Sequence, residues 1–383
     1  MSDSSRKGNQ KDYGGDLFMS NTYLFTGFPG YLATALIEDF FRVRNSIKKI
    51  YLLHLPSMEK QAKKQIETWE EDQNVDTGKI ELVQGDITQE GLGLPSKTSK
   101  QLLQEVTHVF HLAALYDLAV PLMPAWKVNV QGTREVNRWL SQCLQLERYI
   151  YFSTAYVSGK REGVVYETDL SHGNGFKNHY EYTKHEAENL VHRMCKEIPT
   201  TIIRPGIVVG HTKSGATAKF DGPYFILNLI EALKSLPVLP YFGKGKARVN
   251  LVPQDYVIQA TNYLAHHPAS SGKTYHLTDP NPYTAKEIYE QLSYVYADKH
   301  PRFSLPLSLA NQSLKIRPLR KVLGIQREAL DYFLCSADYD NRQAEMDLAA
   351  SDIFCSDFFS YTDALVDYYR EKRCDPSKHV SIL

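Results

Sequence analysis

Short apolar runs alternate with amphipathic stretches over the first 280 residues of the chain. The runs are rich in β-branched and aromatic residues, and between them apolar residues recur at helical spacing. The runs cover residues 21–27, 49–55, 80–87, 107–112, 148–154 and 200–204. Strands that alternate with helices in this way predict an α/β fold, a Rossmann-type doubly wound parallel sheet. A further run, residues 273–277, is expected to return to the same sheet.

The first run leads into a glycine turn, Gly27-Phe-Pro-Gly30, which an apolar helical pattern follows. Such a turn brings helix N–H groups and the positive end of the helix dipole against a pyrophosphate. Gly27 permits the turn, Gly30 lets the backbone approach the phosphates, and Ala33 is small enough for close helix packing. Strand, turn and helix together predict a dinucleotide-binding domain.

The end of the second run bears on the choice of cofactor. An Asp or Glu at this point favours NAD, because its carboxylate binds the adenosine ribose. Here His54 occupies that neighbourhood, and Lys60, Lys63 and Lys64 follow it. Positive groups suit a 2′-phosphate, which favours NADP(H) over NAD(H), although lysines along one helix are also typical of a solvated face.

The ends of the later runs carry groups that suit a binding site. They are Asp86, Ala113-Ala114, Ser153-Thr154 and Pro205-Gly206. Ligands of doubly wound sheets bind beyond the carboxyl ends of the strands, so these residues are expected at one edge. A carboxylate such as Asp86 can accept a hydrogen bond from the adenine amino group, and small residues let the backbone lie against the cofactor.

Tyr180 and Lys184 lie four residues apart in a predicted helix that ends near Cys195, so their side chains share one face. A phenol has an unperturbed pKa of about 10. A neighbouring ammonium favours the phenolate and is expected to lower the pKa of Tyr180. The pair can then pass a proton to or from a carbonyl oxygen. Ser153 and Thr154 point to opposite faces of a regular strand, so only one of them can assist.

The length of the chain, 383 residues, exceeds the ~250–300 residues that a single core usually supports, so a second lobe is expected. We assign residues 20–206 to the NAD(P)-binding domain, with 248–280 returning to it. Residues 207–247 and 281–375 form a smaller substrate-binding lobe, mostly helical because its C-terminal aromatic residues recur at helical spacing. Residues 1–19 are expected to be a disordered leader, and 376–383 a tail.

Composition excludes several classes of function. Lys+Arg and Asp+Glu both number 44, which argues against nucleic acid as a partner. The five cysteines are scattered without C-x-x-C spacing, which predicts reduced thiols, a cytoplasmic protein and no zinc site. No histidine pair has the spacing of a metal site, so no metal is expected. No run reaches the ~18 apolar residues of a transmembrane segment.

Several phrases together resemble an extended short-chain dehydrogenase/reductase over about residues 20–280. They are Thr26–Gly30, Gly85-Asp86, His111–Ala114, Asn129, Ser153–Val157, Tyr180–Lys184 and Arg204-Pro205. Ser153–Val157, Tyr180–Lys184 and Val249–Val257 narrow the resemblance to the fatty acyl-CoA reductase and carrier-protein thioester reductase branch, which has the male-sterility type of NAD-binding domain. In two departures, Ala33 replaces the usual last glycine and His54 replaces the arginine typical of the branch.

The resemblance implies a role for each matching residue. Tyr180 would be the proton donor, Lys184 would hold the nicotinamide ribose, and Thr154 would bond the substrate oxygen, with Ser153 as the runner-up. Asn129 resembles the supporting asparagine of the family. The residues implied at the cofactor are Thr26, Gly27, Phe28, Pro29, Gly30, Tyr31, Leu32, His54, Asp86, Ile87, Ala113, Ala114, Asn129, Tyr180, Lys184, Pro205, Gly206 and Ile207.

The resemblance further implies an NAD(P)H-dependent oxidoreductase that reduces an acyl thioester, on coenzyme A or a carrier protein, to an aldehyde or alcohol. Nucleotide-sugar epimerases, dehydratases and hydroxy-compound dehydrogenases use the same residues, so these alternatives stay open. A non-catalytic cofactor sensor ranks last, because Tyr180 and Lys184 are both present. An apolar helix expected at 224–236 and the lysines around it (Lys213, Lys219, Lys244 and Lys246) favour a thioester with a phosphate-bearing arm. A homodimer also stays open.

Overall fold

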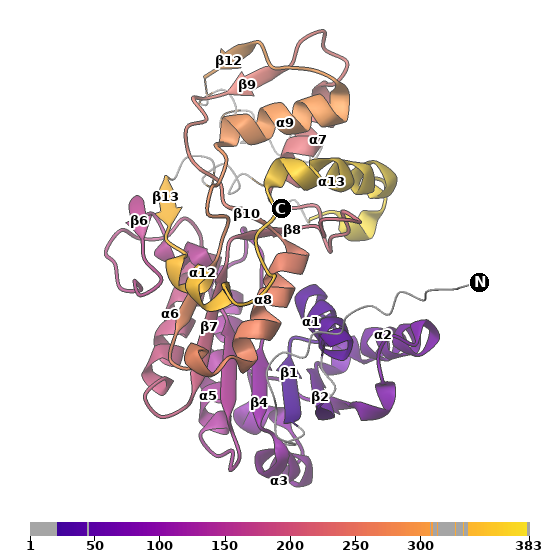
Figure 1. The fold of residues 1–383 in the computed structure, drawn as a ribbon, viewed down its shortest axis with the longest axis vertical. Helices are drawn as coiled ribbons and strands as arrows, with labels where there is room; N and C mark the ends of the chain where they lie inside the picture. Colours follow the sequence, from indigo (N-terminus) through magenta and orange to yellow (C-terminus); the bar gives the residue numbers. More distant parts are fainter. Residues whose placement is uncertain are drawn as a thin grey trace, which may run out of the picture.

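The computed structural model of the chain describes residues 21–43, 46–306, 308, 312, 326, 332 and 336–380. Within them, seven strands form one parallel sheet in the order β11-β7-β5-β4-β1-β2-β3 (Figure 1). They are β1 (Asn21–Thr26), β2 (Ile47–His54), β3 (Ile80–Gln84), β4 (His108–His111), β5 (Arg148–Phe152), β7 (Thr200–Pro205) and β11 (Thr274–Leu277). The expected α/β class and the return of β11 to the sheet are confirmed. The predicted leader, residues 1–19, lies outside the described residues.

Helices cover both faces of this sheet (Figure 1). One face carries α1 (Tyr31–Val43), α2 (Glu59–Asp72), α8 (Gln254–His266) and α12 (Arg342–Leu348); the other carries α3 (Ser96–Glu105), α5 (Thr133–Leu140) and α6 (His179–Met194). Phe40 and Val257 are fully buried on the first face, as is Ala187 on the second. Burying a Val, Leu, Ile or Phe side chain contributes about 1.5–3 kcal/mol, and such residues hold the three layers together.

A second core lies in the lobe at the top of Figure 1. It is built from α7 (Tyr224–Leu233), α9 (Ala285–Ala297) and α13 (Phe358–Lys372). The aromatic residues that recur at helical spacing belong to this core: Tyr289, Phe358 and Tyr361 are buried, whereas Tyr296 and Tyr368 are partly buried against it. The aromatic stripe of the sequence is therefore packing.

Three pairs of short parallel strands connect parts of the lobe to one another and to the domain that contains the sheet. They are β8 (Ile207–Val209) with β10 (Leu251–Pro253), β9 (Pro240–Phe242) with β12 (Phe303–Leu305), and β6 (Gly163–Val165) with β13 (Ala337–Tyr339). Strands β12 and β13 fall in the stretch that was expected to be helical after residue 281. Because β8 follows β7 after Gly206 alone, the lobe begins at the carboxyl edge of the sheet.

Two strands end more than one residue before the apolar pattern predicts. β3 ends at Gln84, so Asp86 lies in a loop, and β5 ends at Phe152, before Ser153 and Thr154. Thr154 instead begins a 3₁₀ turn over Ala155–Ser158, in which its hydroxyl accepts a hydrogen bond from the backbone N–H of Tyr156 at 3.3 Å. A side-chain cap of this kind competes with the strand ladder, because it offers the backbone another partner.

The glycine turn after β1 has little room for side chains. Gly27 adopts a φ of +89°, and a Cβ there would lie 2.8 Å from the backbone nitrogen of Ala113. A Cβ on Gly30 would lie 2.5 Å from the carbonyl oxygen of Gly27. The N–H of Gly30 donates to that same oxygen at 2.7 Å, and α1 begins at the next residue. The turn therefore requires glycine for both its conformation and its closeness to β4.

Candidate active site

Helix α6 positions the central pair of residues. It begins at His179 because Asn178 caps it, its side-chain oxygen accepting a hydrogen bond from the N–H of Glu181 at 2.9 Å. Tyr180 and Lys184 thus lie in the first two turns, at the end of the helix that faces the carboxyl edge of β5. Lys184 is buried, whereas Tyr180 keeps part of its surface exposed.

The hydroxyl of Tyr180 lies beside that of Thr154, which favours the ionised form of the phenol. On another side, the ring of Tyr116 packs edge-on against the ring of Tyr180, with 5.0 Å between the centroids. Burial and, after it, the charge of Glu181 raise the pKa of Tyr180, and Thr154 opposes them. The expectation that Lys184 lowers this pKa is therefore wrong for this structure: burial dominates, and the phenol stays protonated at neutral pH.

The ammonium of Lys184 is held by the strand beside it. It donates to the hydroxyl of Tyr151 at 3.0 Å and to the carbonyl oxygen of Phe152 at 2.5 Å. Burial lowers the pKa of Lys184 to about 7, and the carboxylate of Glu188 opposes that change. An ammonium has three protons to donate, so these two bonds leave one for a further acceptor.

The side chains of Ser153 and Thr154 have different partners, as expected for neighbouring residues whose side chains point to opposite faces of a strand. The Ser153 hydroxyl donates to the buried carboxylate of Glu188, which Arg204 also binds through its Nη2 at 2.5 Å. Burial alone would raise the pKa of Glu188, but Arg204, with His192 and Ser153, holds it well below the usual range. Thr154, and not the runner-up Ser153, therefore meets Tyr180.

Asn129 connects the loop after β4 to helix α6. It lies in a π-helical segment, Trp126–Gly132, and is buried. Its side chain accepts from the N–H of Leu115 at 2.8 Å and donates to the hydroxyl of Thr183 at 3.0 Å. Thr183 precedes Lys184, so Asn129 fixes the turn of α6 that carries the lysine. In this structure it is a positioning residue.

The ends of β1 and β4 are tied together beside the glycine turn. The hydroxyl of Thr26 lies 2.7 Å from Nδ1 of His111 and accepts from the N–H of Ala113 at 3.2 Å. Phe28 is buried against Trp69, so only its backbone is left for a ligand. Around the turn, Leu32 and Ala113 are partly buried, and Gly30 and Ala114 are exposed.

The remaining predicted cofactor residues lie along the same edge. Asp86 accepts from the N–H of Thr88 at 2.8 Å, and Ile87 fills the space where a Cβ on Gly132 would stand. Tyr31 donates to the carbonyl oxygen of Ala216 at 2.7 Å, which ties α1 to the loop after β8. At the end of β7, Pro205 and Gly206 are buried, and Ile207 continues into β8.

The basic residues expected near a 2′-phosphate differ in how exposed they are and in whether they are paired. His54 ends β2, is 4% exposed, and has its Nδ1 3.0 Å from the carbonyl oxygen of Leu55. Lys63 pairs with Glu59 at 2.6 Å, whereas Lys60 and Lys64 are exposed. Around the lobe, Lys213, Lys219, Lys244 and Lys246 are exposed as well.

Three residues beside the site were not predicted from the sequence. Tyr116 comes from the loop after β4, Asp221 from the loop before α7, and Glu188 from α6. Glu188 follows Lys184 by four residues, which was a signal that it shares the helix face. Tyr116 and Asp221 had no comparable signal, because each reaches Tyr180 only through the tertiary fold.

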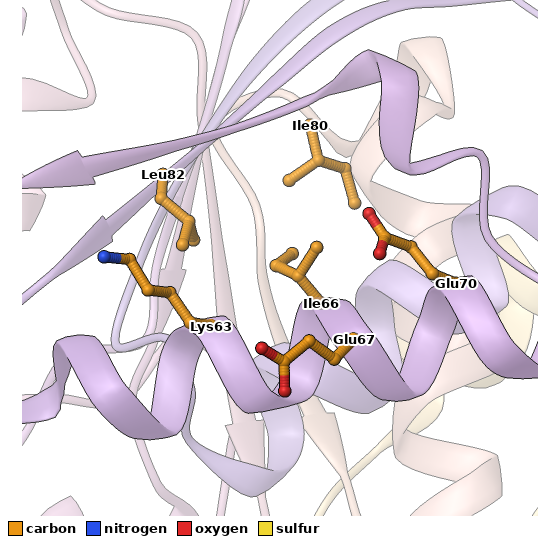
Figure 2. A pocket seen from close by; sticks show the side chains of 6 residues that line it. All are labelled: Lys63, Ile66, Glu67, Glu70, Ile80 and Leu82. Carbon is orange, nitrogen blue, oxygen red and sulfur yellow. The ribbon is translucent and has the colours of Figure 1, made fainter.

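A small hollow lies between α2 and β3 (Figure 2). It is lined by Lys63, Ile66, Glu67, Glu70, Ile80 and Leu82. Within the ranges that the structure describes, no cluster of histidine, cysteine and carboxylate side chains could hold a metal ion. None of the helices in the same ranges has the length and apolar character needed to cross a bilayer.

Comparison with known protein families gives one match. The pattern of the family described as "Male sterility protein", an NAD-binding domain, matches residues 25–261, more than half of the chain. It covers the glycine turn, Thr154, Tyr180 and Lys184.

Among curated proteins, the chain is 26% identical over 269 residues to "Fatty acyl-CoA reductase wat" of Drosophila melanogaster, covering 61% of this chain and 52% of that protein. It is 25% identical over 320 residues to "Alcohol-forming fatty acyl-CoA reductase" of Simmondsia chinensis, covering 64% and 63%. The chain thus spans about half the length of the Drosophila relative.

Among solved structures, the chain is similar to the terminal R domain of the myxalamid PKS-NRPS pathway, with a TM-score of 0.76 at 25% identity, covering 92% of this chain and 91% of that one. It also resembles UDP-glucuronic acid 4-epimerase from Bacillus cereus in complex with NAD, with a TM-score of 0.62 at 19% identity, covering 91% and 99%. At that identity the second likeness concerns the fold alone.

Proposed function

The chain belongs to the male sterility protein family, and from that premise we propose that it is an NAD(P)H-dependent reductase of acyl thioesters. The observation that carries the proposal is the position of Thr154, Tyr180 and Lys184, which lie together at the end of β5 and in the first turns of α6, at the edge where the glycine turn lies. The relatives named as fatty acyl-CoA reductases and the resemblance to an R domain support the thioester as the substrate class.

The residues at the sheet edge fit a nicotinamide dinucleotide. Side chains are excluded at Gly27 and Gly30, so the backbone before α1 can approach a pyrophosphate at the positive end of the helix. The free proton of Lys184 suits a ribose hydroxyl, and Asp86 and Ala114 line the neighbouring strand ends. When bound, the reduced cofactor supplies the hydride.

The chain's own residues would handle the proton and the charge. Thr154 and Tyr180 both offer a hydroxyl to the carbonyl oxygen, which stabilises the negative charge that develops there. Tyr180 then donates its proton to that oxygen. A raised pKa suits this role, because a reductase must begin with the phenol protonated.

A screen of substrate classes tests the proposal. Acyl thioesters, free aldehydes and ketones are each supplied with NADPH and NADH, and turnover is followed by the absorbance of the reduced cofactor. Nucleotide sugars are supplied with the oxidised cofactors and their products are separated by chromatography, because epimerases and dehydratases cause no net change in the cofactor. We expect thioesters of coenzyme A or a carrier arm to be turned over. Activity confined to nucleotide sugars would support the epimerase or dehydratase alternative and would overturn the thioester assignment.

For the cofactor, we propose NADP(H) in preference to NAD(H). The support is the lack of a carboxylate at the end of β2, with Lys60 and Lys64 exposed on the helix that follows. We expect NADPH to bind more tightly than NADH and His54→Asp to reverse that order, because a carboxylate repels the 2′-phosphate and accepts from a free ribose hydroxyl.

Titration of each cofactor by fluorescence measures this preference, and Glu71→Gln, at an exposed carboxylate near the end of α2, is a control that spares β2. Equal affinity of the parent protein for both cofactors would contradict the assignment.

Partners and location follow from the same proposal. We propose a small-molecule substrate carried on coenzyme A or a carrier protein, a cytoplasmic location, and no nucleic acid partner. The support is the balance of 44 basic and 44 acidic residues and the exposed lysines around the lobe. Whether two copies of the chain pair is answered by the mass of the protein in solution.

A further inference from the structure

A carboxylate that the proposed mechanism does not use lies one side chain away from Tyr180. Asp221 stands in the loop between β8 and α7 and is partly buried. The phenol of Tyr116 interacts with its carboxylate and lowers its pKa, and the ring of Tyr116 lies edge-on to Tyr180 at 5.0 Å. Tyr116 is 46% exposed, so this group of side chains is not sealed in the core.

The side chains around Asp221 bring the pKa of its carboxyl group close to neutral pH. Burial raises the pKa of Asp221 to about 6; Lys219 and the phenol of Tyr116 oppose this, and Asp117 adds to it. The charge of Asp221 in turn raises the pKa of Tyr180 and of Tyr224. The charged and titratable groups that interact with Asp221 thus come from four places. They are Tyr116 and Asp117 in the loop after β4, Lys219 in its own loop, Tyr180 in α6 and Tyr224 in α7.

When a thioester is reduced, the leaving sulfur must also receive a proton. None of the residues in the proposed mechanism donates that proton. After the hydride and one proton have been added, the substrate is a hemithioacetal, and Tyr180 has lost its proton. When the hemithioacetal collapses, Tyr180 takes that proton back from the hydroxyl oxygen. The sulfur leaves as a thiolate, whose conjugate acid has a pKa of about 8.5 when it is an alkyl thiol.

We propose that Asp221 is the general acid that protonates the leaving thiolate. The inference rests on the proposed thioester reduction and adds a catalytic residue to it. In this step the C–S bond breaks, its electron pair stays on sulfur, and the proton of Asp221 forms the S–H bond. The O–H electrons form the carbonyl of the aldehyde. Asp221 is left as a carboxylate and regains its proton from solvent, so the complete reaction consumes one hydride and one proton.

The experiment compares two thioesters of the same acyl group, one with an alkyl thiol and one with an aryl thiol. An aryl thiol is the stronger acid, so its thiolate leaves without needing a donor. We expect Asp221→Asn to slow release of the alkyl thiol by about 100-fold, the lower end of the ~10²–10⁴ range for general acids. Release of the aryl thiol by the same variant should change by less than about threefold, which also shows that the variant is folded.

The pH profile supplies a second readout. The acid form of Asp221 is the active one, so release of the alkyl thiol should fall as the pH rises through about 6. Tyr116→Phe removes a hydroxyl that lowers the pKa of Asp221, and this fall should therefore move to higher pH. Asp338→Asn, at an exposed carboxylate paired with Arg248, is the matched control and should leave the profile unchanged.

The outcomes separate this inference from the function on which it rests. Equal slowing of alkyl and aryl thioesters by Asp221→Asn, or no slowing of either, would overturn the role of Asp221 while thioester reduction stands. If the parent protein releases thiol from neither thioester, the proposed function itself fails.

Discussion

Replacing Tyr180 with phenylalanine should lower turnover by about 100-fold or more and leave cofactor affinity nearly unchanged. The change removes the proton that the carbonyl oxygen receives, and general acid catalysis is typically worth ~10²–10⁴ in rate. The ring remains, so its edge-on contact with Tyr116 is kept. Steady-state rates and a fluorescence titration with NADPH measure the two quantities on the same preparation.

Tyr182→Phe is the matched control for this prediction. Tyr182 lies two residues further along α6 and packs against Trp126 and Phe176, away from Tyr180. Its variant should keep the activity of the parent. If Tyr180→Phe stayed within about threefold of the parent, Tyr180 would not be the proton donor.

Replacing Arg204 with methionine should cost about 3–5 kcal/mol of unfolding free energy, because it leaves a buried charge without its main partner. Arg204 and Glu188 are both fully buried, and Nη2 of the arginine lies 2.5 Å from Oε1 of the carboxylate. Nε of Arg204 donates to the same oxygen at 3.0 Å. The pair joins α6 to β7 behind the helix turn that carries Lys184.

Denaturant unfolding of the single and double variants tests this account. Glu188→Gln combined with Arg204→Met should recover much of the lost stability, since no unpaired charge then remains buried. Arg342→Met removes an exposed arginine from its carboxylate partner Asp340 and should cost far less. Equal losses for Arg204→Met and Arg342→Met would contradict a stabilising role for the buried pair.

The strands, their alternation with helices and the helix of Tyr180 could be predicted from the sequence, because they follow from local periodicity. The order of the strands in the sheet was not predicted, because it depends on tertiary packing. Apolar runs gave the strands, and the spacing of Tyr180 and Lys184 placed both side chains on one helix face. The sequence also predicted that only one of Ser153 and Thr154 can face Tyr180. The structure places Thr154 there, just past the end of β5, where its hydroxyl accepts a hydrogen bond from the N–H of Tyr156.

The electrostatics of the site could not be predicted in the same way. From spacing alone, Lys184 was expected to lower the pKa of Tyr180, but burial raises it. Burial is a property of the assembled layers and lobe, as is the approach of Tyr116 and Asp221 to Tyr180. Those two residues lie more than 100 positions apart in the sequence, on loops that carry no periodic pattern. Their meeting depends on how the lobe sits on the carboxyl edge of the sheet.

The central claim is that this chain breaks a thioester with a hydride, and one measurement tests it most directly. Free thiol and oxidised cofactor are followed together, by a chromogenic thiol reagent and by the absorbance of NADPH, with acyl-CoA and acyl-carrier thioesters as substrates. The account predicts that thiol appears only while NADPH is consumed, and that neither change occurs with Tyr180→Phe. Steady oxidation of NADPH by aldehydes or ketones, without thiol release from any thioester, would contradict it.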